Sequence, residues 1–164
     1  MAPKGRKRFP IATALGLIWA LAVLWLGRQL AVPIAMIQPV LMGAVFAPGL
    51  VLAAMIGRIT LRRAFDPTLV EGQRPPPGTA ADVDARALQN TIEQLALALC
   101  LWPLVGFSLG AGMVLALGLG FAAARLIFWI GYHRSAAVRM FGFWASFFPS
   151  VLAALWVLAR LGSG

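Results

Sequence analysis

Long apolar stretches alternate with short polar intervals along almost the whole of this 164-residue chain. A helix needs about twenty apolar residues to cross roughly 30 Å of hydrocarbon, and several of the stretches approach that length. We therefore predict five transmembrane helices, at residues 11–27, 40–57, 85–106, 112–131 and 140–159. The second of them is expected to continue as an interfacial helix to Phe65.

Composition agrees with this pattern. Hydrophobic residues make up 61% of the chain and charged residues 12%, whereas a soluble domain carries about 25% charged residues. The single cysteine, Cys100, excludes an internal disulfide framework. We expect an all-α integral membrane protein of multi-pass type, which would lie in the inner or plasma membrane if the source is prokaryotic.

Residues 66–84 form the one extended polar segment. They contain four of the five acidic residues and three successive prolines, Pro75, Pro76 and Pro77. Neither a helix nor a strand continues through such a run. We predict a surface loop, which leaves Glu93 as the single acidic residue within a predicted span.

The basic residues predict the orientation of the chain. Cytoplasmic loops of membrane proteins carry an excess of Lys and Arg. If the N-terminus is cytoplasmic, the intervals 58–86 and 132–139 lie on the same side, and only Arg28 and Arg160 of the fourteen basic residues lie opposite. The net charge of +9 therefore indicates topology rather than nucleic-acid binding.

Three polar residues share one stripe at the start of the third predicted span. Asn90 follows Arg86 by four residues, and Glu93 follows Asn90 by three, so a helix presents all three on one face. Ionisable groups this close to hydrocarbon usually face a bundle interior or a wet cavity. They could equally form a network that pins two helices together.

A second polar cluster, at the same predicted membrane face, lies around Tyr132 and Arg139, with Arg125 in the preceding span. Guanidinium groups bind carboxylates through a planar fork, and Glu93 could hold an ammonium group. The two clusters together suit a small zwitterionic ligand with several carboxylates. The sequence has no His, Cys and Asp cluster typical of a metal site.

The motif Arg-x-x-x-Asn-x-x-Glu at 86–93 resembles the signature of the MAPEG family, the membrane-associated proteins of eicosanoid and glutathione metabolism. Leu-Arg-Arg-Ala-Phe at 61–65 is similar to the end of the family's first helix. Gly-Tyr-His-Arg-Ser-Ala-Ala-Val-Arg at 131–139 is similar to the segment before its last helix, and Arg125 matches a basic position upstream. The resemblance covers roughly residues 40–160.

The resemblance implies a four-helix bundle that forms a homotrimer in the lipid bilayer, with glutathione between subunits near the cytoplasmic face. Residues 37–164 would be this domain, and residues 1–36 a basic segment with one extra transmembrane helix. The implied glutathione-binding residues are Arg86, Asn90, Glu93, Tyr132, Arg62, Arg63 and Arg125, and Arg139 would stabilise the thiolate. The implied activity is that of a transferase or peroxidase acting on a lipophilic electrophile or hydroperoxide.

The chain departs from the family pattern at several positions, among them Gln94, Phe128 and Met140, the last of which follows Arg139 where the prostaglandin-type member has serine. Gln94 stands where leukotriene-type members carry tyrosine, and Phe128 stands where they have another ring hydroxyl, so Tyr132 is the chain's single tyrosine. A fold can persist while its chemistry is lost. Two alternatives therefore remain: a non-catalytic MAPEG-fold protein that binds a lipid or a partner protein, and a small transporter subunit with Arg125, Glu93 and Arg139 along a polar path.

Overall fold

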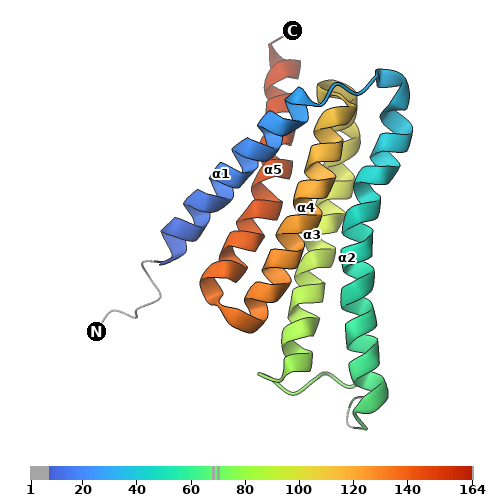
Figure 1. Ribbon diagram of the computed structural model, residues 1–164, viewed down its shortest axis with the longest axis vertical. Helices are drawn as coiled ribbons and strands as arrows, with labels where there is room; N and C mark the ends of the chain where they lie inside the picture. The colour runs from blue at the N-terminus through green and yellow to red at the C-terminus, as the bar shows by residue number, and fades with distance from the viewer. Residues whose placement is uncertain (1–7, 68, 70, 164) are drawn as a thin grey trace.

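The computed structural model describes residues 8–67, 69 and 71–163, and this part of the chain is all-α (Figure 1). The helices are α1 (Arg8–Gln29), α2 (Ile37–Phe65), α3 (Ala80–Leu109), α4 (Ala111–Arg134) and α5 (Ala136–Gly162), with a 3-10 turn η1 (Ile34–Met36) before α2. Each of the five long helices is long and apolar enough to cross a membrane. The prediction of an all-α, multi-pass membrane protein is confirmed.

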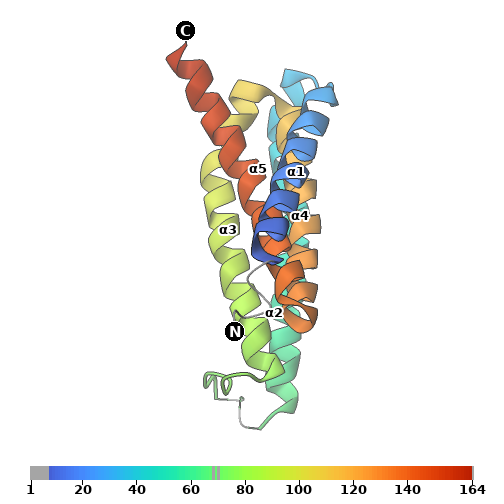
Figure 2. The same cartoon turned by 90° about the vertical axis from the view of Figure 1, so that its left-hand side faces the viewer.

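The helices run up and down around α4, which packs against all four others (Figure 1). α2, α3 and α5 complete a four-helix bundle with α4, and α1 lies along α5 and α4 on its outside (Figure 2). The connection between α2 and α3 and the junction between α4 and α5 lie at one end of the bundle (Figure 1). We call this end the polar end.

Close packing holds the bundle together, because lipid tails are as apolar as leucine and give little hydrophobic drive between helices. The core joins Trp102 of α3 to Val114, Leu117 and Phe121 of α4, all at most 2% exposed. The Trp102 and Phe121 rings meet edge to face with centroids 5.8 Å apart. The Trp102 indole N–H donates to the Ser150 hydroxyl at 3.1 Å, which ties α5 to this core.

The predicted loop at 66–84 is too long by five residues, because α3 begins at Ala80. Thr79 caps this helix: its hydroxyl accepts the backbone N–H of Asp82 at 3.2 Å. The Asp82 carboxylate in turn accepts the backbone N–H of Gly78 at 2.9 Å. A Thr with an acidic residue three positions later is a helix-start signal that the neighbouring prolines obscured.

The two intervals between the later helices, one glycine-rich and one polar, are also shorter than predicted. The glycine-rich interval 106–112 reduces to Gly110, whose φ of 100° suits glycine. The interval 132–139 reduces to Ser135, an extended residue between α4 and α5. Tyr132 and Arg139 therefore both lie on helices, close to a sharp reversal of the chain.

Candidate functional site

A cleft of about 360 Å³ lies at the polar end of the bundle. Small-molecule sites commonly enclose about 300 to 1,000 Å³, so its size suits a small ligand. The cleft brings together one residue of α3 with residues of α4 and α5, namely Asn90, Phe128, Tyr132, Arg139, Met140 and Phe143. Three of the residues predicted from the sequence, Asn90, Tyr132 and Arg139, therefore lie around one cavity.

Two glycines bring α4 and α5 close enough to build this cleft. Gly131 packs against the backbone of Arg139, and Gly142 packs against the backbone of Phe128. A Cβ atom at either position would overlap backbone atoms of the facing helix, which cannot move aside as a side chain can. The glycines thus fix the distance between Tyr132 and Arg139 through the main chain.

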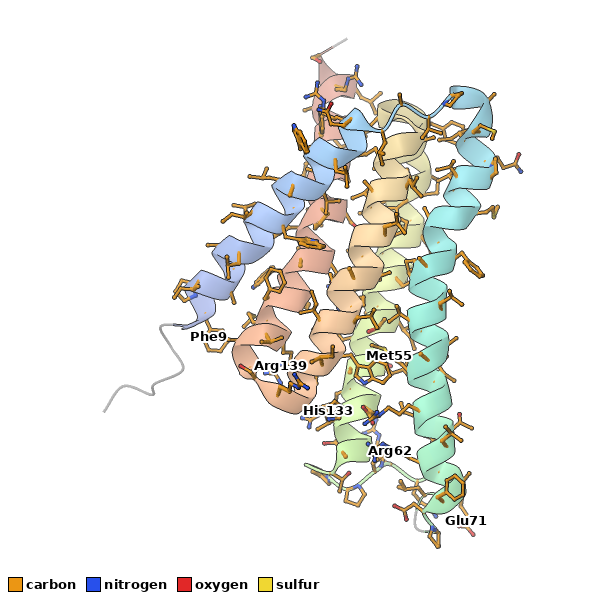
Figure 3. The ribbon with its side chains drawn as sticks, viewed as in Figure 1. Phe9, Met55, Arg62, Glu71, His133 and Arg139 are labelled. Carbon is orange, nitrogen blue, oxygen red and sulfur yellow. The ribbon has the colours of Figure 1, made fainter. Side chains whose placement is uncertain are left out.

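Aromatic contacts hold the Arg139 side chain in place. Its guanidinium carbon lies 4.9 Å from the centroid of the Tyr132 ring, a cation–π arrangement. The Tyr132 ring itself meets Phe128 edge to face at 5.0 Å. Figure 3 shows Arg139 beside the turn between α4 and α5. The cleft therefore contains a positioned cation against an aromatic wall.

Arg125 lies behind the cleft and is fully buried. It donates to Oδ1 of Asn90 at 3.1 Å, to Oγ1 of Thr91 at 2.8 Å and to Oγ of Ser146 at 3.2 Å. Its guanidinium carbon lies 3.7 Å from the centroid of Phe128. Neutral acceptors and an aromatic face thus surround this cation, and its contacts with the cleft run through Asn90 and Phe128.

Arg86 and Glu93 lie on the outer face of α3 rather than in the cleft. Arg86 forms an ion pair with Asp82 at 2.8 Å, and its side chain is 57% exposed. The Glu93 carboxylate accepts a hydrogen bond from Nε2 of Gln89 at 3.0 Å. Of these three residues, Asn90 alone lines the cleft, and the partners that the structure describes for Arg86 and Glu93 are their helical neighbours Asp82 and Gln89.

The two arginines near the end of α2 have different surroundings. Arg62 faces the bundle and binds Asp84 through Nε at 2.8 Å. Arg63 lines a separate cavity of about 190 Å³ between α2 and α3, together with Thr60 and Gln89. Neither arginine lines the cleft around Arg139.

The model of one protein family, described as the MAPEG family, matches residues 38–160. The chain belongs to the MAPEG family. No curated protein and no solved structure matches the chain. The match begins at the second residue of α2, so α1 precedes the part of the chain that is shared with other MAPEG proteins.

This MAPEG chain also contains a buried charge cluster that sequence reasoning missed. The carboxylate of Asp84, 1% exposed, accepts hydrogen bonds from four side chains at the polar end. Arg58 Nε and Arg62 Nε donate to Oδ2 at 2.9 and 2.8 Å. Trp129 Nε1 donates to Oδ1 at 2.9 Å, and His133 Nε2 lies 2.7 Å from the same oxygen. Asp84 thus ties α3 to α2 and α4.

A helical stripe could have revealed this cluster. Asp84, Ala87, Thr91, Ala98 and Trp102 are all buried, and they follow one another at three, four, seven and four positions along α3. This spacing marks one face of a helix. The predicted proline-containing loop obscures this signal, because it includes Asp84. A polar residue that continues an apolar stripe is easily taken for the end of the helix.

Proposed function

We propose that this MAPEG protein is a glutathione-dependent transferase or peroxidase, in which a bound thiolate attacks a lipophilic electrophile or hydroperoxide. The observation that carries the proposal is the cleft in which Asn90, Tyr132 and Arg139 surround about 360 Å³. Asn90 supplies both donors and an acceptor for peptide groups, Tyr132 supplies a hydroxyl and Arg139 supplies a cation. Glutathione offers partners for all three.

Arg139 would act on the sulfur atom. A free thiol has a pKa of about 8.5, and a nearby cation favours the thiolate, which is the nucleophile. In conjugation, the sulfur forms a bond to an electrophilic carbon, the bond from that carbon to its leaving group breaks, and the leaving group takes up a proton. With a hydroperoxide, the sulfur attacks the outer oxygen, the O–O bond breaks, and the alkoxide takes up a proton and leaves as the alcohol. A second glutathione thiol then attacks the sulfur of the resulting sulfenic acid, which gives glutathione disulfide and water.

The outer face of α3 supports a homotrimer. Glu93 is a carboxylate on a spanning helix, and the hydrogen-bond donor that the structure describes for it is the neutral Gln89. Holding a carboxylate against lipid is costly, so a neighbouring copy that covers this face and supplies a cation would be stabilising. Arg86, Glu93 and Arg63 would then complete the glutathione site between subunits.

We also propose that the N-terminus and the cleft face the cytoplasm. The polar end carries Arg58, Arg62, Arg63, Arg134 and Arg139, whereas Arg28 and Arg160 lie at the opposite ends of their helices. An excess of arginine marks the cytoplasmic side of membrane proteins. The lipophilic substrate would then enter from the bilayer, and glutathione from the cytosol.

Thermal unfolding in detergent tests the proposal. A ligand at 100 times its dissociation constant stabilises the folded state by about 2.7 kcal/mol, so saturating glutathione should raise the melting temperature. The Asn90→Ala variant should lose this rise, and the Arg134→Ala variant should keep it, because Arg134 is exposed and lies outside the cleft. A wild-type protein with no glutathione-dependent shift would contradict the proposal; a shift without turnover would favour a non-catalytic binding protein.

A further inference from the structure

A second hollow lies at the polar end, on the side of the bundle where α2 meets α4. It has a volume of about 730 Å³ and opens to the surface. Three of its lining residues, Arg58, Arg62 and Trp129, belong to the Asp84 cluster; the others are Ala54, Gly57, Leu61 and Phe65. None of these residues lines the cleft around Arg139, so this groove is a separate feature.

The two arginines of the groove are held in a fixed arrangement. Both bind the same oxygen of Asp84, and both do so through Nε. A guanidinium group has five N–H donors, so binding through Nε leaves the two Nη groups as donors for a further acceptor. Arg58 also makes a cation–π contact, in which its guanidinium carbon lies 5.6 Å from the centroid of the Trp129 ring.

The charge of this cluster favours an anion. Two guanidinium groups face one carboxylate, which leaves an excess positive charge before His133 is counted. The side chains of Arg58 and Arg62 are 46% and 33% exposed, so a ligand can reach them. Two arginines at a spacing of four residues on one helix match the oxygens of a phosphate group.

The rest of the groove is apolar. Leu61 is 61% exposed and Phe65 84% exposed, while Gly57 and Ala54 continue the surface along α2 toward the middle of the bundle. The groove thus combines anion donors at the end of a spanning helix with an apolar wall that runs into the membrane. This combination matches a lipid with an anionic headgroup and an acyl chain.

We propose that the α2–α4 groove is a binding site for an anionic phospholipid, with its phosphate on Arg58 and Arg62 and an acyl chain along Gly57 and Leu61. The lipid would lie on a different side of α4 from the proposed glutathione site, since Trp129 lines the groove with α2 whereas Phe128 and Tyr132 line the cleft with α5. The inference does not depend on the protein's being an enzyme.

Native mass spectrometry of the intact protein in detergent, titrated with phosphatidylglycerol or phosphatidylcholine, tests this site. The informative variant is Gly57→Leu, because a Cβ atom at Gly57 meets nothing within 4 Å. The added side chain fills the groove without disturbing the Asp84 cluster. Gly43→Leu is the matched control: it also lies in α2, a Cβ atom there meets nothing within 4 Å, and it does not line the groove.

Both lipids carry a phosphate, but the ammonium group of phosphatidylcholine is repelled by the two guanidinium groups, so the wild type should bind phosphatidylglycerol roughly tenfold more tightly. Gly57→Leu should remove this preference, and Gly43→Leu should keep it. Arg58→Gln should weaken phosphatidylglycerol binding more than phosphatidylcholine binding and so reduce the preference, because the choline ammonium already offsets the phosphate charge in phosphatidylcholine. Equal binding of the two lipids by the wild type, or an unchanged preference in Gly57→Leu, would overturn the proposal. So would inorganic phosphate that binds as tightly as phosphatidylglycerol, since the acyl chain would then contribute nothing.

Discussion

The guanidinium group of Arg139 lies over the ring of Tyr132, 4.9 Å from its centroid, across the junction between α4 and α5. Arg139 follows Tyr132 by seven positions in the chain, and Ser135 is the single non-helical residue between the two helices. Gly131 lets the two backbones approach closely enough for this contact. A cation is thus held at a defined place in the cleft without an acidic partner that would neutralise it among the described residues.

Replacing Arg139 by Ala should lower turnover of glutathione with an electrophilic substrate by about 10²-fold, the effect of removing one donor that stabilises a reacting anion. The fold should be retained, because Arg139 lies at the edge of the bundle rather than in its core. Steady-state kinetics in detergent check this. Arg134→Ala is the control, and equal loss in both variants would contradict a specific role for Arg139.

Replacing Tyr132 by Phe should separate the two roles of this side chain. The ring that supports Arg139 remains, while the hydroxyl is removed. We expect glutathione to bind about fivefold more weakly, as loss of one hydrogen bond of roughly 1 kcal/mol implies. Turnover at saturating glutathione should change little. Isothermal titration and kinetics together measure this, and unchanged affinity would exclude the hydroxyl from the glutathione site.

Arg125→Met should affect ligand binding more than stability. A buried ion can often be replaced by an apolar side chain of similar volume with little loss of stability. Thr91 and Ser146 would still donate to the backbone oxygens of Ala87 and Gly142. Asn90, however, would lose the donor that orients its amide. We expect a melting temperature close to that of the wild type and weaker glutathione binding. A lowered melting temperature with unchanged glutathione binding would make Arg125 a purely structural residue.

Asp84→Asn should destabilise the fold. The substitution leaves Arg58 and Arg62 without their anion, and both are partly exposed, so we expect a loss of about 1–3 kcal/mol. The control is Asp82→Asn, two residues away, which removes the exposed ion pair with Arg86 and should cost less than about 1 kcal/mol. Reversible unfolding in mixed micelles measures both. Similar losses would mean that the Asp84 cluster contributes no more than a surface pair.

The sequence predicted the five spans, because hydropathy is a local property of the chain. Predicting that Asn90, Tyr132 and Arg139 lie near one another also required the family resemblance, since these residues belong to three different helices. The start of α3 was placed too late, because Pro75 to Pro77 dominated the interpretation of a segment whose capping residues are Thr79 and Asp82.

Contacts between helices were harder to predict. The resemblance implied that Arg62 binds glutathione; in the structure of one chain, Arg62 and Arg58 both bind a buried carboxylate contributed by another helix. Arg125 was predicted to bind the ligand; in the structure it donates to Asn90, which lines the cleft. A charge in a sequence shows that a partner is needed. Which partner it finds depends on the rotation of each helix, which hydropathy alone does not give.

The ionisation of bound glutathione is the direct test of whether Arg139 stabilises a thiolate in the cleft. The thiolate absorbs ultraviolet light that the thiol does not, so a pH titration of the difference spectrum between the glutathione complex and its components gives the pKa of the bound thiol. If Arg139 stabilises the thiolate, the bound thiol should have a pKa clearly below the value of about 8.5 for a free thiol, and this pKa should return to that value or above it in Arg139→Ala. A bound thiol that titrates like free glutathione in the wild type, or a lowered pKa that survives Arg139→Ala, would exclude this role for Arg139.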